Sequence, residues 1–159
     1  MANDLINIVN RVNNALRAER PKRIAASAVL AKHKPRIFDR GETETGGKIG
    51  TYGTKPISIS AKNQARNTGK TYFKGGYAEY KSAVGKNPGF VILRNTDQMY
   101  ADYGLVQSGS DFGFGFQNDF NANKSGWMED KYDKSIFSLS ESEFNLFVDV
   151  LVSEQTKAF

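Results

Sequence analysis

The order of apolar and polar residues predicts helices in the first forty residues. Four apolar residues follow one another at intervals of four, three and four and would share one helical face: Leu5, Val9, Val12 and Leu16. Asp4 is a candidate cap for this helix, and we expect Pro21 to end it. A second helix is predicted from about Lys22 to Lys34, rich in alanine and stopped by Pro35.

Residues 39–70 break this helical pattern. They contain six glycines and few large apolar residues, and the segment is too long for an ordinary connection. Only Pro56 to Ser60 alternates in the manner of a short strand. The segment is either a disordered linker or an extended arm that orders against a neighbouring subunit. Its spaced apolar side chains favour the arm and are candidate interface residues: Ile49, Tyr52, Ile57 and Ile59.

Residues 71–159 alternate between short helices and strands. We expect a helix from Gly76 to Val84, closed by Gly85 in a C-cap role. The elements predicted after it are a turn at 87–89, a strand at 90–93, a helical turn at 96–103, antiparallel strands at 105–107 and 112–116, and a helix at 121–132. In the second antiparallel strand three phenylalanines alternate with glycines, which predicts a core face: Phe112, Phe114 and Phe116.

The last helix has the clearest start signal. Ser140 and Glu143 form a capping box, and Leu139 with Phe144 forms a hydrophobic staple. Its expected buried face carries four residues: Phe144, Phe147, Val148 and Leu151. The sequence thus predicts an α+β fold with N-terminal helices (1–38), an extended glycine-rich arm (39–70) and an α+β core (71–159). In that core a small antiparallel sheet packs with helices, including a C-terminal helix, and the whole chain forms one domain.

The net charge of +5 is unevenly distributed. The first eighty residues carry a formal charge of +9, and the remainder carries −4. This polarity suits head-to-tail association, and it also suits a basic arm beside nucleic acid or a solvated basic surface. The basic candidates for an interface lie around the expected helix boundary: Arg17, Arg20, Lys22 and Arg23.

Residue patterns that support catalysis are weak. There is no cysteine, and a lone histidine such as His33 is usually a surface or packing residue. The glycines at 46–50 resemble a phosphate loop, but Ile49 stands where that motif needs serine or threonine. Acidic clusters at 42–44, 97–102 and 129–133 are typical of solvated surfaces. We therefore expect no enzyme, no cofactor, no metal and, because no apolar run is long enough, no membrane span.

Aromatic side chains are interleaved with lysines between residues 70 and 81. Tyr72, Phe73, Tyr77 and Tyr80 lie among three lysines. Such a pattern can stack nucleic-acid bases or anchor a protein partner. The chain has no recognisable RNA-binding motif, which favours protein contact and makes Tyr77 and Tyr80 candidate interface residues.

Several stretches, in order, resemble a family of tailed-phage virion-morphogenesis or tail-completion proteins. The middle of the chain is similar to that family in the following residues: Ile37-Phe38, Gly41, Gly47, Ile49-Gly50-Thr51-Tyr52 and Lys55 to Ile59. The later part is similar in these segments: Gly76 to Tyr80, Glu129 to Tyr132 and Ile136 to Ser140. At Thr96 to Met99 the chain lacks the glycine of the corresponding family turn.

The resemblance implies a structural virion protein that forms a homo-oligomeric ring at the phage head–tail interface. Its expected neighbours are portal, neck or tail proteins, with non-specific contact to channel DNA and assembly in the cytoplasm of a bacterial host. The alternative, drawn from the charge pattern, is a basic nucleic-acid-binding protein that uses its N-terminal helices.

Overall fold

The elements of the chain form an α+β fold, as the sequence predicts. The computed structural model describes residue 10 and residues 18–109 and 111–157. In chain order the elements are α2 (Glu19–Phe38), β1 (Ile57–Ser58), the 3-10 turn η1 (Ala61–Asn63), β2 (Tyr72–Phe73), α3 (Gly76–Ala83), α4 (Gln98–Asp102), β3 (Tyr103–Ser108), β4 (Asp111–Phe116), α5 (Asp119–Tyr132) and α6 (Glu141–Thr156).

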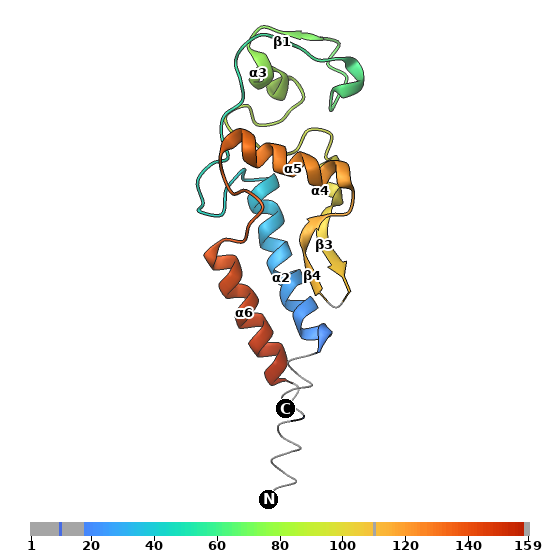
Figure 1. The fold of residues 1–159 in the computed structure, drawn as a ribbon. Coiled ribbons are helices and arrows are strands. Elements are labelled where there is room, and N and C mark those ends of the chain that lie inside the picture. Colours follow the sequence, from blue (N-terminus) through green and yellow to red (C-terminus); the bar gives the residue numbers. More distant parts are fainter. Residues whose placement is uncertain (1–9, 11–17, 110, 158–159) are drawn as a thin grey trace, which may run out of the picture.

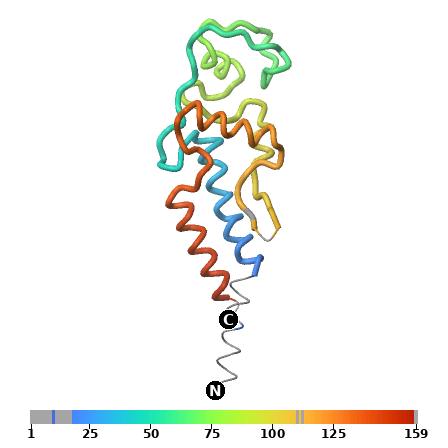
Figure 2. The backbone as a smooth tube through the Cα atoms, viewed as in Figure 1, coloured from blue at the N-terminus to red at the C-terminus, as the bar shows by residue number. Residues whose placement is uncertain are grey.

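These elements make an elongated molecule with a body and a lobe (Figure 1). In the body α6 packs along α2, the β3–β4 hairpin lies on the other side of α2, and α5 crosses one end. The lobe comprises residues 54–86, with β1, β2 and α3, and lies beyond α5. The chain enters the lobe once and returns to the body once (Figure 2).

Helix α2 contains Pro21 and Pro35, so the predicted helix end at Pro35 is wrong, whereas the end of the helix expected before Pro21 lies outside the described residues. Pro21 lies in the first turn, where a backbone N–H has no intrahelical partner to lose. Pro35 lies in the last turn, and its own carbonyl accepts hydrogen bonds from the N–H groups of Asp39 and Arg40. A proline this close to the end removes little of the helix. The predicted apolar face at residues 5–16 and the cap at Asp4 lie outside the described residues.

The body is held together by one hydrophobic cluster that draws on most of its elements. Phe38, at the end of α2, is fully buried and meets Tyr100 edge-on, with ring centroids 5.7 Å apart. Burying a side chain of this size contributes about 1.5–3 kcal/mol. The buried members of the cluster are Ile37, Phe38, Ile49, Tyr52, Val91, Met99, Tyr103 and Ile136.

The lobe has a smaller core of its own. Phe73, Tyr80 and Val84 are buried there, and the partly buried Ile57 and Ile59 pack against them. The Tyr80 hydroxyl accepts a hydrogen bond from the Ala65 N–H (2.7 Å) and donates one to Asn95 Oδ1 (3.0 Å). These bonds tie the lobe to the segment that leads back into the body.

The segment predicted to be an extended arm packs on other parts of the same chain. Its residues 39–53 pack on the chain's own body, where Ile49 and Tyr52 are buried core residues. The Tyr52 hydroxyl accepts from the Ile92 N–H (2.9 Å) and donates to the Ile92 carbonyl (2.8 Å). The rest of the segment forms part of the lobe, where Ile57 and Ser58 pair antiparallel with Phe73 and Tyr72. The glycines allow this tight folding and do not indicate a free arm.

Two glycines are required where the backbone approaches itself closely. Gly41 has φ +60°, and a Cβ atom there would lie 2.1 Å from the carbonyl oxygen of Val91. Gly76 has φ +70°, and a Cβ atom would lie 2.5 Å from the carbonyl oxygens of Gly53 and Lys55. Any other residue would both strain the left-handed backbone and displace a neighbouring segment.

The hairpin prediction is confirmed, whereas the strand predicted at 90–93 is wrong. Strands β3 and β4 pair antiparallel over their whole length, with Leu105 opposite Phe114. Phe114 and Phe116 pack, partly buried, against the body core. Residues 90–93 are irregular instead, because Val91 donates a single backbone bond to Gly50 (2.8 Å) and makes no ladder.

Candidate functional site

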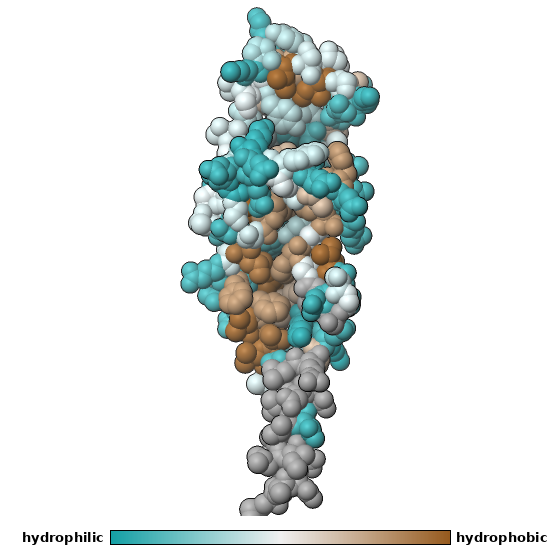
Figure 3. Space-filling view, in the orientation of Figure 1, coloured by the Kyte–Doolittle hydropathy of each residue, from teal (hydrophilic) through white to brown (hydrophobic). Residues whose placement is uncertain are grey.

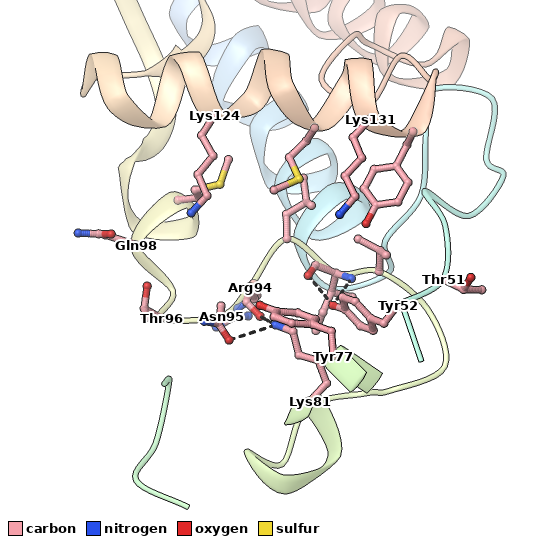
Figure 4. A pocket seen from close by; sticks show the side chains of 17 residues that line it. Thr51, Tyr52, Tyr77, Lys81, Arg94, Asn95, Thr96, Gln98, Lys124 and Lys131 are labelled. Atoms are coloured by element: carbon pink, nitrogen blue, oxygen red, sulfur yellow. Dashed lines mark hydrogen bonds between the residues drawn. The ribbon is translucent and has the colours of Figure 1, made fainter. Parts of the chain in front are cut away.

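A cavity of about 550 Å³ lies between α5 and the lobe (Figure 4). Lys124, Met128 and Lys131 reach it from α5, and Tyr77 and Lys81 reach it from α3. The connecting segments 51–53 and 91–96, with Gln98 and Met99 of α4 and Tyr132 of α5, form the remaining walls. The cavity therefore exists because the chain crosses twice between body and lobe while α5 covers the crossing.

The cavity walls carry positive charge that no lining carboxylate balances. Within the described residues its lining includes Lys81, Arg94, Lys124 and Lys131 but no aspartate or glutamate. Arg94 is neutralised outside the cavity, by Asp39 (2.6 Å) and Asp97 (2.8 Å). For the three lysines the described part of the chain contains no ion pair. Three ammonium groups that form no ion pair in that part of the chain therefore border the cavity.

Lys81 is the most deeply placed of these cations. Its side chain is 1% exposed, and its Nζ donates to the Arg94 carbonyl at 2.6 Å and to Asn95 Oδ1 at 3.4 Å. Burial lowers the pKa of Lys81 to about 8, and the positive charges of Lys86 and Lys124 act in the same direction, while Asp97 opposes them. A buried lysine with a lowered pKa beside a cavity is a recognised mark of a functional site.

The other walls of the cavity are apolar or aromatic. Val91, Leu93, Met99 and Met128 line it together with tyrosine rings. The Tyr52 hydroxyl is already used by Ile92, and burial raises the pKa of Tyr52 to about 12, so it stays neutral. The cavity therefore combines cations with a surface suited to an organic group.

A second group of buried charges joins α2 to α6. Arg36 Nε donates to Glu143 Oε1 (2.9 Å), and His33 Nδ1 lies 3.0 Å from Glu143 Oε2. The other imidazole nitrogen of His33 lies 2.7 Å from the Tyr103 hydroxyl. Arg36 also donates to the carbonyl of Ser138 (2.7 Å). In this group every buried charge has a partner of opposite sign or a hydrogen bond.

The protonation of this buried group follows from its contacts. Burial acts to raise the pKa of Glu143, but hydrogen bonds from Arg36, the Ser140 N–H and His33 outweigh it and hold that pKa at about 2. Burial lowers the pKa of His33 below its ordinary value of 6.5, even though Glu143 favours the charged imidazole. The group is closed to solvent and serves to fasten α6 onto α2.

Helix α6 exposes part of the face that was expected to be buried. The capping box of Ser140 and Glu143 is confirmed. Phe144 and Val148, however, are 56% and 40% exposed, so the predicted burial of these two residues is wrong. Val152 continues the same face and is 52% exposed. We call these three residues the α6 stripe, and Figure 3 shows apolar side chains gathered over this part of the body.

The predicted interface residues are scattered. Arg17 lies outside the described residues, Arg20 and Arg23 are exposed at the start of α2, and Lys22 is partly buried there. Ile57, Ile59 and Tyr77 are partly buried against the chain's own cores. The remaining three are buried against the chain's own side chains: Ile49, Tyr52 and Tyr80.

Sequence reasoning missed the residues that the fold brings together. His33 was expected to be a surface or packing residue, and it is a buried packing residue, but its partner Glu143 was not foreseen. Lys124 and Lys131, two helical turns apart on α5, were not singled out. Their spacing on one face was a usable signal, but nothing in the sequence placed Lys81 opposite them.

Neither a metal site nor a membrane span is present in the described residues. No cluster of three histidine, aspartate or glutamate side chains in that part of the chain is placed to hold a metal ion. Among the described helices, none has both the length and the apolar character of a bilayer-crossing segment.

Comparison with known proteins adds no relative. No protein-family model, no curated protein and no solved structure matches this chain. The functional argument therefore depends on the residues themselves.

Proposed function

We propose that this chain is a structural virion protein that assembles with copies of itself into a ring at the head–tail interface of a tailed phage. In that position it would join neighbouring portal, neck or tail proteins around the DNA channel. The ordered motifs between Ile37 and Ser140 support the phage assignment through their resemblance to tail-completion proteins. The observation that carries self-assembly is the exposed α6 stripe.

The stripe favours a protein partner because Phe144, Val148 and Val152 lie one helical turn apart on the same face. Contiguous exposed apolar side chains on a soluble domain mark contact surfaces. Isolated exposed apolar residues, in contrast, are common on protein surfaces and do not indicate a contact surface.

The charge pattern favours a second copy of the chain as that partner. Helix α6 carries Glu141 and Asp149 at exposed positions beside the stripe, whereas Arg20 and Arg23 are exposed at the start of α2. The acidic α6 of one copy can therefore meet the basic start of α2 in the next. Such a contact joins two different surfaces and can close into a ring.

Replacing the α6 stripe tests this proposal. We expect the purified wild-type chain to form large oligomers in sedimentation velocity and rings in electron micrographs. The triple variant Phe144→Gln, Val148→Gln and Val152→Gln should be a monomer with a similar melting temperature. The matched control, Asn145→Gln with Ser153→Gln on the same helix, should assemble like the wild type. A monomeric wild type at all concentrations contradicts self-assembly.

Charge reversal separates the proposal from nucleic-acid binding. Changing Arg17, Arg20, Lys22 and Arg23 to glutamate should weaken the oligomer more at low salt than at high salt. A wild-type monomer whose DNA affinity falls steeply with salt, and is lost in this variant, would support the nucleic-acid alternative instead.

A further inference from the structure

We propose that the cavity between α5 and the lobe is a binding site for a small organic molecule that carries a phosphate group. This inference does not depend on assembly of the chain. It starts from Lys124 and Lys131, which extend from α5 into the cavity (Figure 4). Residues seven apart in a helix are separated by about 10 Å along its axis. Two ammonium groups thus border the same space from one wall.

The charge balance of the cavity favours a phosphate over a single carboxylate. Lys81, Lys124 and Lys131 bring three positive charges, and no aspartate or glutamate lines the cavity among the described residues. A phosphate monoester or diphosphate supplies two or more negative charges and several acceptor oxygens. Lysine binds phosphate as a point charge and needs no paired planar geometry. A doubly charged anion therefore compensates this site better than a carboxylate does.

The size and lining of the cavity favour an organic group attached to that phosphate. The volume of about 550 Å³ lies within the range of small-molecule sites, roughly 300–1,000 Å³. Apolar side chains such as Leu93 and Met128 also line the cavity. A bare phosphate would leave this apolar surface uncovered.

The depth of Lys81 favours a small molecule over a nucleic-acid chain. Lys81 lines the cavity although it is only 1% exposed, so its charge acts on whatever enters the cavity. Polymeric phosphate backbones are bound by cations on exposed grooves and surfaces. A nucleic-acid chain is the other possible source of the phosphate group, and the experiment below distinguishes it from a small molecule.

Lys81 also provides an independent readout. The groups that face it are the cations Lys86 and Lys124, the carboxylate Asp97, and the rings of Tyr52 and Tyr77. An anion in the cavity would favour the charged ammonium, so binding near pH 8 should take up a proton. Titration calorimetry in two buffers of different ionisation enthalpy measures that uptake. The Lys81→Gln variant, which retains a donor for the Arg94 carbonyl, should not show it.

Titration calorimetry also measures the binding itself. We would titrate the full chain with ADP, with pyrophosphate and with a single-stranded oligonucleotide. The variants are Lys124→Gln and Lys131→Gln, and the matched control is Lys74→Gln, an exposed lysine in the lobe outside the cavity lining.

The proposal expects saturable binding of ADP, weaker binding of pyrophosphate, and a loss of affinity of about tenfold or more in each α5 variant. The control should bind like the wild type. The proposal is overturned by no saturable binding of ADP at physiological salt, by equal losses in the Lys74→Gln control, or by binding of the oligonucleotide alone. Melting curves of each variant show whether a loss of binding reflects unfolding. A loss with an unchanged melting temperature supports the site, and retained ADP affinity in folded Lys124→Gln and Lys131→Gln variants overturns it.

Discussion

Two places where the described residues bury charge are organised in opposite ways. Between α2 and α6, the carboxylate of Glu143 is hydrogen-bonded by Arg36 and His33 at 2.9–3.0 Å. Between α5 and the lobe, Lys81 is as deeply buried, but its hydrogen-bond acceptors are a carbonyl and an amide oxygen, and it faces the rings of Tyr52 and Tyr77. The first place is filled by side chains, whereas the second borders a cavity.

This difference separates a structural group from a candidate binding site. A buried charge with a hydrogen-bonded counter-charge is compensated within the fold. A buried lysine without a carboxylate destabilises the folded state unless it loses its proton or gains an anion. Lys81 is therefore expected to destabilise the folded state of the ligand-free chain. Binding of an anionic ligand is one physical reason for a buried lysine at this position.

Removing the paired carboxylate should give the largest effect. The Glu143→Ala variant leaves Arg36 and His33 buried without their counter-charge, and it also breaks the capping box. We expect the free energy of unfolding to fall by about 3–5 kcal/mol. Urea denaturation measures this change. The control Asp149→Ala, at an exposed carboxylate on the same helix, should change it by less than about 0.5 kcal/mol.

Acid should weaken the same group in two steps. His33 has a lowered pKa in the fold, so the unfolded chain takes up a proton first and stability falls as the pH drops below 6.5. Glu143, with a pKa of about 2, contributes stability that is present above pH 4.5 and lost toward pH 2. The second step is on the order of 3 kcal/mol. Unfolding free energies measured from pH 7 to pH 3 should fall less steeply in Glu143→Gln than in the wild type.

The unpaired lysine should respond to pH in the alkaline range. Because the pKa of Lys81 is about 8 in the fold and 10.5 when unfolded, its penalty is present below pH 8 and relieved as the pH rises toward 10.5. The stability of Lys81→Met relative to the wild type should therefore decline from pH 7 to pH 10, by about 2 kcal/mol. The ionisation of tyrosines affects the wild type and the Lys81→Met variant alike, so it cancels in the difference between their unfolding free energies. A difference that is constant with pH would show that Lys81 is not perturbed.

The smallest effect is expected at the two α5 lysines. Lys124 and Lys131 have no ion pair among the described residues, so replacing either with glutamine should change the unfolding free energy by less than about 0.5 kcal/mol. Thermal denaturation of the ligand-free chain checks this. A large loss of stability would mean that these lysines belong to the fold, as Glu143 does, and would remove the contrast between the two places.

Local signals in the sequence determined several elements correctly. Gly85 ends α3 with φ +73°, and the N–H groups of Gly85 and Lys86 bond the carbonyls of Ser82 and Lys81. The antiparallel hairpin around residues 108–111 and the capping box of α6 also formed where their residues predicted them. Each of these depends on residues within a few positions of one another, so the sequence alone is enough.

The tertiary structure decided which faces are buried and which charges meet. Periodicity predicted an apolar buried face for α6, yet Phe144 and Val148 are exposed while the charged Glu143 is buried, because Arg36 and His33 of α2 provide its partners. Likewise, Lys81 and Lys124 are 43 positions apart in sequence, and only the return of the chain beneath α5 places them around one cavity. Burial depends on contacts between distant segments, and a local pattern does not contain them.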